Sequence, residues 1–354
     1  MKSTKLIVGF ICTVLVPATA QSAMAVENVS TQEQSQWLRW VIPLPKKIRI
    51  NRKVELPASE VKITLRQSAG EMEKTAADQL IALLREKGGA DGNGEAFEIL
   101  IGVCDAGGKI GDVTLTDTTE LSNLPNRDQA YLIRPVGQNR LVLTALHERG
   151  VFYAAQTLRQ LLERGGESEN GTVTIPLVSV TDWPDMAQRG EAGAITWFPP
   201  EEIKWMARHK MNMAVYHVGY RILEDGHGDV TKLYPERIAS ARRHAFEMVP
   251  YITHYSILGE YTNLFEVYPH LNKGKTKVDG QVVMDLGERD LKTVPCPSEP
   301  KMAEVLADFM CAMAKAGAKE VDCWLTEGRR YQCRCDKCLG AGENMHYALE
   351  ARAY

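Results

Sequence analysis

The sequence predicts an α/β protein: an N-terminal α+β sheet-and-helix domain followed by a partial (β/α)8 TIM-type barrel. Two observations carry this prediction. In the first half of the chain, strand and helix patterns follow one another in mixed order, which is typical of one sheet with helices on one face. In the second half, short apolar runs alternate with helical segments, which is typical of parallel strands joined by crossover helices.

Residues 1–25 have the pattern of a secretory signal peptide. Lys2 and Lys5 precede an apolar run over residues 6–16, and the small residues of the segment AMA at 23–25 follow it. We expect cleavage after Ala25 and export to the periplasm or the extracellular space, with a retained N-terminal anchor as the alternative. The mature protein is expected to have no stable membrane span, because no later segment approaches the ~20 apolar residues of a membrane helix.

Residues 26–182 are expected to form the α+β domain. Strands are predicted at 47–56, 96–104, 129–135, 140–145 and 172–180, and helices at 70–87 and 151–162. The first helix is followed by Gly88 and Gly89, which are typical of a helix end. We place the domain boundary at the segment DWP, residues 182–184.

Residues 183–354 are expected to form the first part of the barrel. Apolar runs at 213–217, 248–253 and 320–325 alternate with helical segments at 200–209, 235–246 and 301–316. A complete barrel takes about 250 residues, and the last segment, 343–354, has the pattern of a helix cut in mid-course. The sequence therefore predicts a fragment or an incomplete barrel.

The charge pattern does not favour a nucleic-acid partner. The chain has 42 basic and 45 acidic residues and a net charge of −3, and its basic residues are spread along the chain. Since polyanion binding needs a concentrated basic patch, no nucleic acid is expected as a partner.

One carboxylate has the position of a catalytic acid. Glu327 follows the apolar run that ends in the segment VDCWLT, and active sites of parallel barrels lie at the carboxyl ends of their strands. A carboxyl group at such a strand end can act as a general acid that protonates a leaving group. We therefore predict that Glu327 is the general acid, with a solvated loop glutamate as the alternative.

Other residues near predicted strand ends are candidates for lining the same site and binding its substrate. Glu260 is the second-choice carboxylate, and His217 and His254 could hydrogen-bond hydroxyl groups, although a histidine beside aromatic residues is often simply packed. Trp324 could stack on a ring of the substrate, with burial in the core as the alternative.

Four segments carry a resemblance to a known family: QAYLIRPVGQNRLVLTALHERGVFYAAQTLRQLL, DWPDMAQRG, FPPEEIKWMARHKMN and VPCPSEPKMAEVLADF. Their order resembles glycoside hydrolase family 20, the β-N-acetylhexosaminidases, in the N-terminal domain and the first barrel strands. The resemblance implies a hydrolase of β-N-acetylhexosaminides or related glycans. It also matches Arg189 to the family's sugar-binding arginine, whose fork of donors can hold two hydroxyls. An ion pair that seals the domain interface is the alternative.

The resemblance is incomplete at the reacting groups. In the family, an Asp-Glu pair ends strand four: the Glu protonates the leaving oxygen and the Asp orients the substrate's acetamido group. Thr326 and Glu327 occupy the matching positions, so the Asp is missing. Barrels with a similar N-terminal domain, including α-glucuronidases and family 84 enzymes, remain open.

Three cysteines follow Glu327 closely. Cys333, Cys335 and Cys338 have the C-x-C-x-x-C spacing that brings three sulfurs to one metal ion, and thiolates suit a structural zinc. Cys323, Cys296 or His346 could supply a fourth ligand. Because Cys12 leaves with the signal, seven of eight cysteines remain. The alternative is a disulfide with one thiol left over.

These features predict an exported glycoside hydrolase that uses Glu327 as its acid and needs no cofactor for catalysis. Two other classes stay open. One is a carbohydrate-binding protein that kept this scaffold without the acid pair. The other is a redox or metal-binding module centred on the cysteines.

Overall fold

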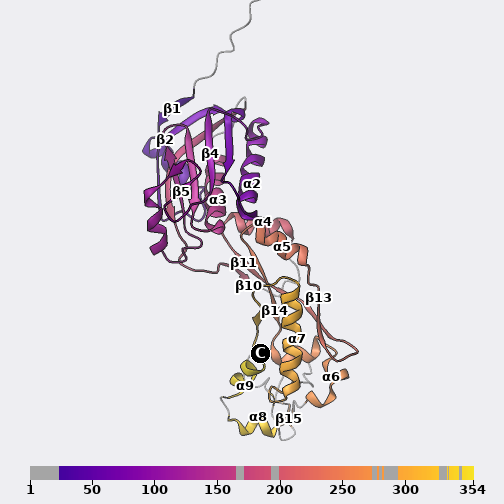
Figure 1. The fold of residues 1–354 in the computed structure, drawn as a ribbon. Helices are drawn as coiled ribbons and strands as arrows, with labels where there is room; N and C mark the ends of the chain where they lie inside the picture. Colours follow the sequence, from indigo (N-terminus) through magenta and orange to yellow (C-terminus); the bar gives the residue numbers. More distant parts are fainter. Residues whose placement is uncertain are drawn as a thin grey trace, which may run out of the picture.

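The computed structural model describes residues 24–164, 171–192, 199–272, 277–278, 281–282, 294–326, 333, 335–342 and 345–354. A sheet-and-helix unit formed by the first half of the chain lies end to end with a smaller parallel sheet formed by the second half (Figure 1). Within these ranges, no helix has the length and apolarity needed to cross a membrane.

The first unit is built on a seven-stranded mixed sheet in the order β1-β2-β9-β7-β8-β4-β3. Its strands are β1 (Ala25–Asn28), β2 (Lys47–Pro57), β3 (Val61–Leu65), β4 (Phe97–Val103), β7 (Tyr131–Val136), β8 (Arg140–Ala145) and β9 (Thr172–Asp182). β3, β4 and β8 run parallel, whereas the remaining pairs are antiparallel. The five predicted strands are confirmed; β1 and β3 were not predicted.

Two long helices cover one face of this sheet (Figure 1). They are α2 (Glu71–Gly88) and α3 (Glu148–Arg164), which pack against each other, and the shorter α1 (Thr31–Leu38) contacts α3. As predicted, α2 ends at a glycine: Gly89 has φ +68°, a conformation that favours glycine. Small apolar clusters on the opposite face lie beneath β5 (Lys109–Ile110), β6 (Val113–Thr114) and the 3-10 helix η2 (Thr116–Asn123).

The second unit contains an open sheet of four strands in the order β10-β11-β14-β17. They are β10 (Gly190–Ala192), β11 (Met213–His217), β14 (Glu247–Ile252) and β17 (Asp322–Cys323), and all neighbours are parallel. The crossover helices are α4 (Pro200–Arg208), α5 (Pro235–Arg243) and α7 (Pro300–Lys315). The predicted alternation of strands and helices is confirmed; for the barrel, the described residues show this half-barrel sheet and no closed ring.

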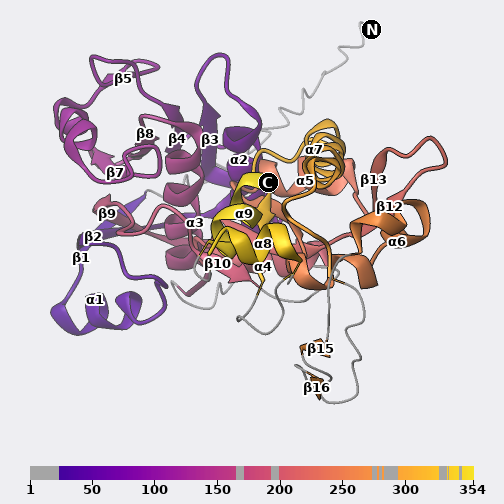
Figure 2. The ribbon, with the colours of Figure 1, turned by 90° about the horizontal axis from the view of Figure 1, so that it is seen from below.

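Shorter elements surround the second sheet. They are β12 (Gly219–Ile222), β13 (Gly228–Thr231), η4 (Tyr255–Glu260), α6 (Leu264–Val267), η5 (Pro269–Leu271), β15 (Lys277–Val278), β16 (Gln281–Val282), α8 (Asp336–Gly340) and α9 (His346–Ala353). Seen from below, α8 and α9 lie together near the middle of the molecule, and the β12–β13 hairpin and α6 lie to one side (Figure 2).

A buried ion pair joins the two units. The ammonium of Lys210, between α4 and β11, lies 3.2 Å from Asp182 Oδ2 at the end of β9 and donates to the hydroxyl of Tyr131 at 2.8 Å. The side chains of Lys210 and Asp182 are only 5% and 11% exposed. The pair therefore fixes the start of the second unit against the first sheet.

Candidate functional site

One face of the second sheet carries a cluster of its own. Val215, Val249 and Tyr251 are buried together there, with Met213 and Trp324 packed against them. The alternate residues of β11 and β14 belong instead to the main core beneath the helices. Because successive side chains of a strand point to opposite faces, the sheet has a helix-covered face and a second face whose rings gather at the carboxyl end.

Trp324 lies on this second face, just after β17. Its indole stacks on the ring of Tyr251, with centroids 4.4 Å apart and planes inclined by 14°. Its Nε1 donates to Asp322 Oδ2 at 2.7 Å, and its backbone N–H donates to the carbonyl of Ile252 at 3.1 Å. Trp324 is half-buried, so stacking and hydrogen bonding fix the ring while part of it stays accessible.

Asp322 is a residue that the sequence analysis missed. It pairs with Tyr251 across the sheet, so it shares the face that carries the aromatic cluster. The only signal in the sequence was its spacing of two residues from Trp324. Its carboxylate orients the indole.

His217 ends β11 and extends the row of rings. Its imidazole lies edge-on to Tyr251 at 5.0 Å and to Tyr220 at 5.9 Å, and it lies 5.5 Å from Tyr261. Burial lowers the pKa of His217, which favours a neutral imidazole at pH 7. A neutral ring at this position can both donate and accept a hydrogen bond.

His254 and Glu260 follow β14. The imidazole Nδ1 of His254 lies 2.9 Å from the carbonyl oxygen of Leu325, and its ring centroid is 4.8 Å from that of Trp324. Glu260, the last residue of η4, is exposed. The structure thus brings His217, His254 and Trp324 to one end of the sheet and leaves Glu260 on the surface.

Glu327 lies outside the described residues, and Thr326 is the last described residue before it. Thr326 is 3% exposed, and its backbone N–H and its hydroxyl both bind the buried carboxylate of Glu350 in α9. Its N–H donates to Oε2 at 2.8 Å and its hydroxyl donates to Oε1 at 2.5 Å. Glu350 was not predicted, since a carboxylate 24 positions away carries no local signal of this contact.

Arg189 lies at the junction of the two units, at the amino end of β10. Its guanidinium donates to the carbonyl of Lys210 at 3.0 and 2.8 Å and to the carbonyl of Met186 at 2.6 Å, and it lies over the ring of Tyr153. The guanidinium of Arg189 therefore binds backbone carbonyls at the amino end of the sheet, whereas His217 lies at its carboxyl end. The match of Arg189 to a sugar-binding arginine stays a prediction.

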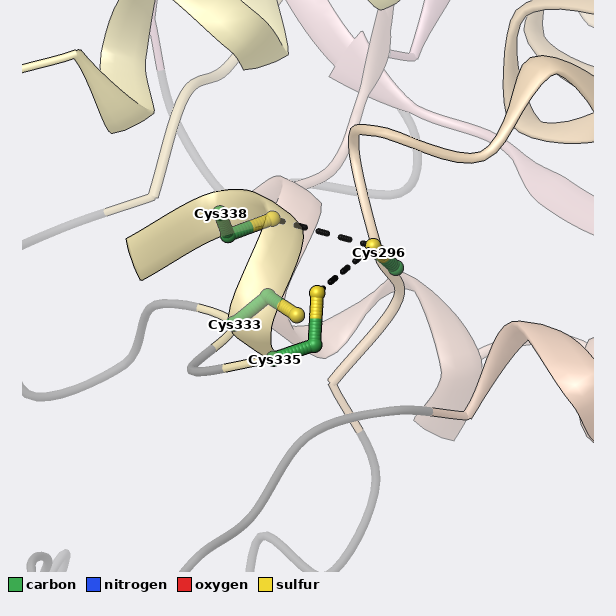
Figure 3. Close-up of side chains that lie close together, drawn as sticks. All are labelled: Cys296, Cys333, Cys335 and Cys338. Carbon is green, nitrogen blue, oxygen red and sulfur yellow. Dashed lines mark hydrogen bonds between the residues drawn. The ribbon is translucent and has the colours of Figure 1, made fainter. Parts of the chain in front are cut away.

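Four cysteines converge beside this region (Figure 3). The sulfur atoms of Cys296, Cys333, Cys335 and Cys338 all lie within 4.8 Å of one another. Cys296 joins the triplet as the fourth cysteine; the sequence had left it as one of three candidates for the fourth ligand. Cys323, the second candidate, is not in the cluster, and His346, the third, contacts the thiol of Cys338.

Hydrogen bonds link the clustered thiols. Contacts with neighbouring thiols, that of Cys338 among them, together with burial raise the pKa values of Cys296 and Cys333. The contacts with Cys296 and Cys333 lower the pKa of Cys338, where His346 and Ser298 act in the same direction. The Ser298 hydroxyl lies 3.2 Å from the sulfur. None of the cysteines that the structure describes forms a disulfide.

The order of elements defines a mixed α/β protein in which an α+β domain leads into a parallel sheet. Residues 39–183 match the family model described as glycosyl hydrolase family 20, domain 2. The chain therefore carries a family 20-like domain over most of its first unit, as the resemblance implied.

Solved structures of family 20 proteins share this fold. The β-N-acetylhexosaminidase of Streptomyces coelicolor A3(2) aligns over 89% of this chain at 18% identity with a TM-score of 0.56. The chitobiase of Flavobacterium johnsoniae aligns over 81% at 16% identity with a TM-score of 0.54. The chain spans 63% and 44% of the lengths of these two proteins.

Proposed function

We propose that the full-length protein is an exported glycoside hydrolase that acts on β-N-acetylhexosaminides or related glycans, with Glu327 as its general acid. The observation that carries the proposal is the row of His217, Tyr251 and Trp324 rings at the carboxyl end of the parallel sheet. Parallel barrels bind substrates at this end of their strands, and aromatic rings suit the apolar faces of sugars. The family 20-like domain and the fold of the family 20 hydrolases support the same reaction class.

The roles follow from these positions. Trp324 would stack on the sugar ring next to the scissile bond, and Asp322 would act as a positioning residue that holds the indole. Glu327, three residues beyond Trp324, would protonate the leaving oxygen. His217 and His254 would bind hydroxyl groups from the neighbouring strand ends.

Thr326 occupies the position of the aspartate that orients the acetamido group in family 20, so it limits how the substrate can assist the reaction. A threonine hydroxyl that is hydrogen-bonded to a buried glutamate cannot replace a carboxylate that orients an acetamido group. A mechanism assisted by the substrate's acetamido group therefore needs another carboxylate, for which Glu260 is the proposed candidate. A glycan without an acetamido group is equally compatible with these residues.

The decisive test is Glu327→Gln in the full-length protein, assayed on a panel of aryl glycosides that includes β-N-acetylglucosaminide and α-glucuronide. We expect kcat to fall by ~10²–10⁴, the contribution of a positioned general acid. Glu320→Gln is the matched control, because Glu320 precedes the amino end of β17, is exposed and binds Gln188. The activity of this variant should match that of the wild type.

The same experiment separates the hydrolase from a carbohydrate-binding protein. The anchoring of Thr326 by Glu350 is a structural role that such a binder would also show. A carbohydrate-binding protein would bind the glycan without releasing reducing sugar, and Glu327→Gln would leave its glycan affinity unchanged. This result would refute the hydrolase proposal.

A further inference from the structure

We propose that Cys296, Cys333, Cys335 and Cys338 bind one structural zinc ion, and that this ion fixes the strand end that precedes Glu327. The argument for this metal site does not depend on the proposed hydrolase activity. Only its consequence for Glu327 rests on that proposal.

The sulfur geometry fits a tetrahedral ion. An ion bound ~2.3 Å from each of four sulfurs holds them about 3.8 Å apart. Cys296 Sγ lies 3.5 Å from Cys335 Sγ and 3.7 Å from Cys338 Sγ, and every sulfur is within 4.8 Å of every other (Figure 3). A disulfide would instead join two sulfurs at ~2.05 Å and leave two more thiols crowded against it.

The surroundings also suit a closed structural site. Cys296, Cys333 and Cys338 are buried at 0%, 3% and 3% exposure, and Cys335 is half-buried. Four thiolates with no open position are typical of structural zinc. A catalytic zinc would keep one position for water or substrate.

The site would cross-link two segments that are far apart in the sequence. Cys296 precedes α7, whereas Cys335 is the N-cap of α8 and Cys338 lies within α8. Besides the cysteines, a small apolar cluster joins these segments, and Lys337 of α8 pairs with Glu299, the N-cap of α7, at 3.3 Å. Because an ion pair with an exposed lysine contributes only ~0–1 kcal/mol, a bound ion would be the stronger link between α8 and the start of α7.

A chain of contacts leads from the cysteines to the end of β17. His346 contacts the thiol of Cys338, and its Nε2 lies 2.8 Å from Oε1 of Glu350. Glu350 in turn binds the N–H and hydroxyl of Thr326. A histidine placed between a ligand and a carboxylate can orient both, so loss of the ion should loosen Thr326, the residue before the proposed acid.

The first experiment is elemental analysis of the full-length protein, purified without added metal or reductant. We expect about one zinc per chain, and replacement by Co²⁺ should give the visible absorption of a tetrahedral cobalt thiolate. Cys296→Ser should lose the metal. Cys323→Ser and the exposed Cys311→Ser should retain it, which separates Cys296 from the other cysteines.

Several outcomes would overturn the metal site. They are wild-type protein without metal and without cobalt thiolate absorption, a peptide mass that shows a disulfide within the cluster, or iron in place of zinc. Zinc retained at full stoichiometry in Cys296→Ser would remove Cys296 from the ligands. Because the wild-type measurement needs no variant, a misfolded mutant cannot mask the result.

The second experiment measures hydrogen exchange at the amide of Thr326, which donates to Glu350. Removal of zinc by a chelator should speed exchange there, and His346→Ala should speed it while zinc stays bound with ~10–100-fold weaker affinity. Unchanged exchange after zinc removal would refute the coupling. Bound zinc in a protein without glycosidase activity would leave the metal site intact and refute only the proposed function.

Discussion

The buried pair of Lys210 and Asp182 allows a sharp test of how the two units are held together. Asp182→Asn keeps the shape of the side chain but removes its charge. Asp182 accepts hydrogen bonds from the N–H of Lys46 at 3.0 Å and from the hydroxyl of Tyr131 at 2.8 Å, besides its contact with Lys210. The substitution leaves an ammonium in a site where its side chain is only 5% exposed.

The expected magnitude follows from that burial. Removal of one partner of a buried ion pair costs ~3–5 kcal/mol of unfolding free energy, because the other charge stays desolvated. Burial already lowers the pKa of Lys210 while Asp182 opposes the shift. Replacement of both partners, Asp182→Asn with Lys210→Met, should therefore recover much of the loss.

Asp185→Asn is the matched control, three positions along the chain. Asp185 is 75% exposed and pairs with Lys46 at the surface, so its loss should cost less than ~1 kcal/mol. Urea unfolding followed by circular dichroism measures each change from the midpoint and slope. If the unfolding free energies of Asp182→Asn and Asp185→Asn differ by less than about 1 kcal/mol, the buried pair does not stabilise the junction as argued.

Three further predictions concern other parts of the molecule. Burial opposes ionisation of Glu73, but hydrogen bonds from Arg66 and two backbone N–H groups outweigh burial and lower the pKa of Glu73. The ionised Glu73 should therefore stabilise the fold fully above the ordinary glutamate pKa of ~4.3, and this contribution should be lost as pH falls through the lower folded-state pKa. Melting temperatures between about pH 6 and 3 should show a flatter dependence in Glu73→Gln. Trp324→Ala should raise KM for an aryl glycoside ~10-fold, equivalent to ~1.4 kcal/mol of lost stacking, with a smaller effect on kcat; equal KM values would remove the ring from the site. Gly190→Ala would place its Cβ against the carbonyl oxygen of Met213 and should destabilise the β10–β11 pair by ~1–3 kcal/mol in urea unfolding, whereas Gly340→Ala, with open space around it, should not.

Much of the fold is a local property of the sequence. The helix at 70–87 became α2 within one residue at each end, and the strand at 140–145 became β8 with the same bounds. Periodic apolar residues and terminal glycines act over a few positions, so they can be recognised without the rest of the chain. β3 was missed because a five-residue alternation next to a 3-10 turn is a weak signal.

The candidate site residues were proposed one by one from the sequence. Trp324, His217 and His254 were chosen because each lies at or just past the end of a strand pattern, and parallel strands bring their carboxyl ends to one edge. Their mutual arrangement, with Trp324 stacked on Tyr251 and held by Asp322, depends on the register of β14 against β17.

The sequence by itself determined the alternation of elements, the triplet of cysteines and the absence of an aspartate before Glu327. Only the tertiary structure decided that Cys296 completes the cluster and that Thr326 is held by Glu350. It also placed Arg189 against carbonyl groups at the junction. The physical reason is range: backbone patterns depend on neighbours in the chain, whereas converging thiols and buried hydrogen bonds depend on the packing of distant segments.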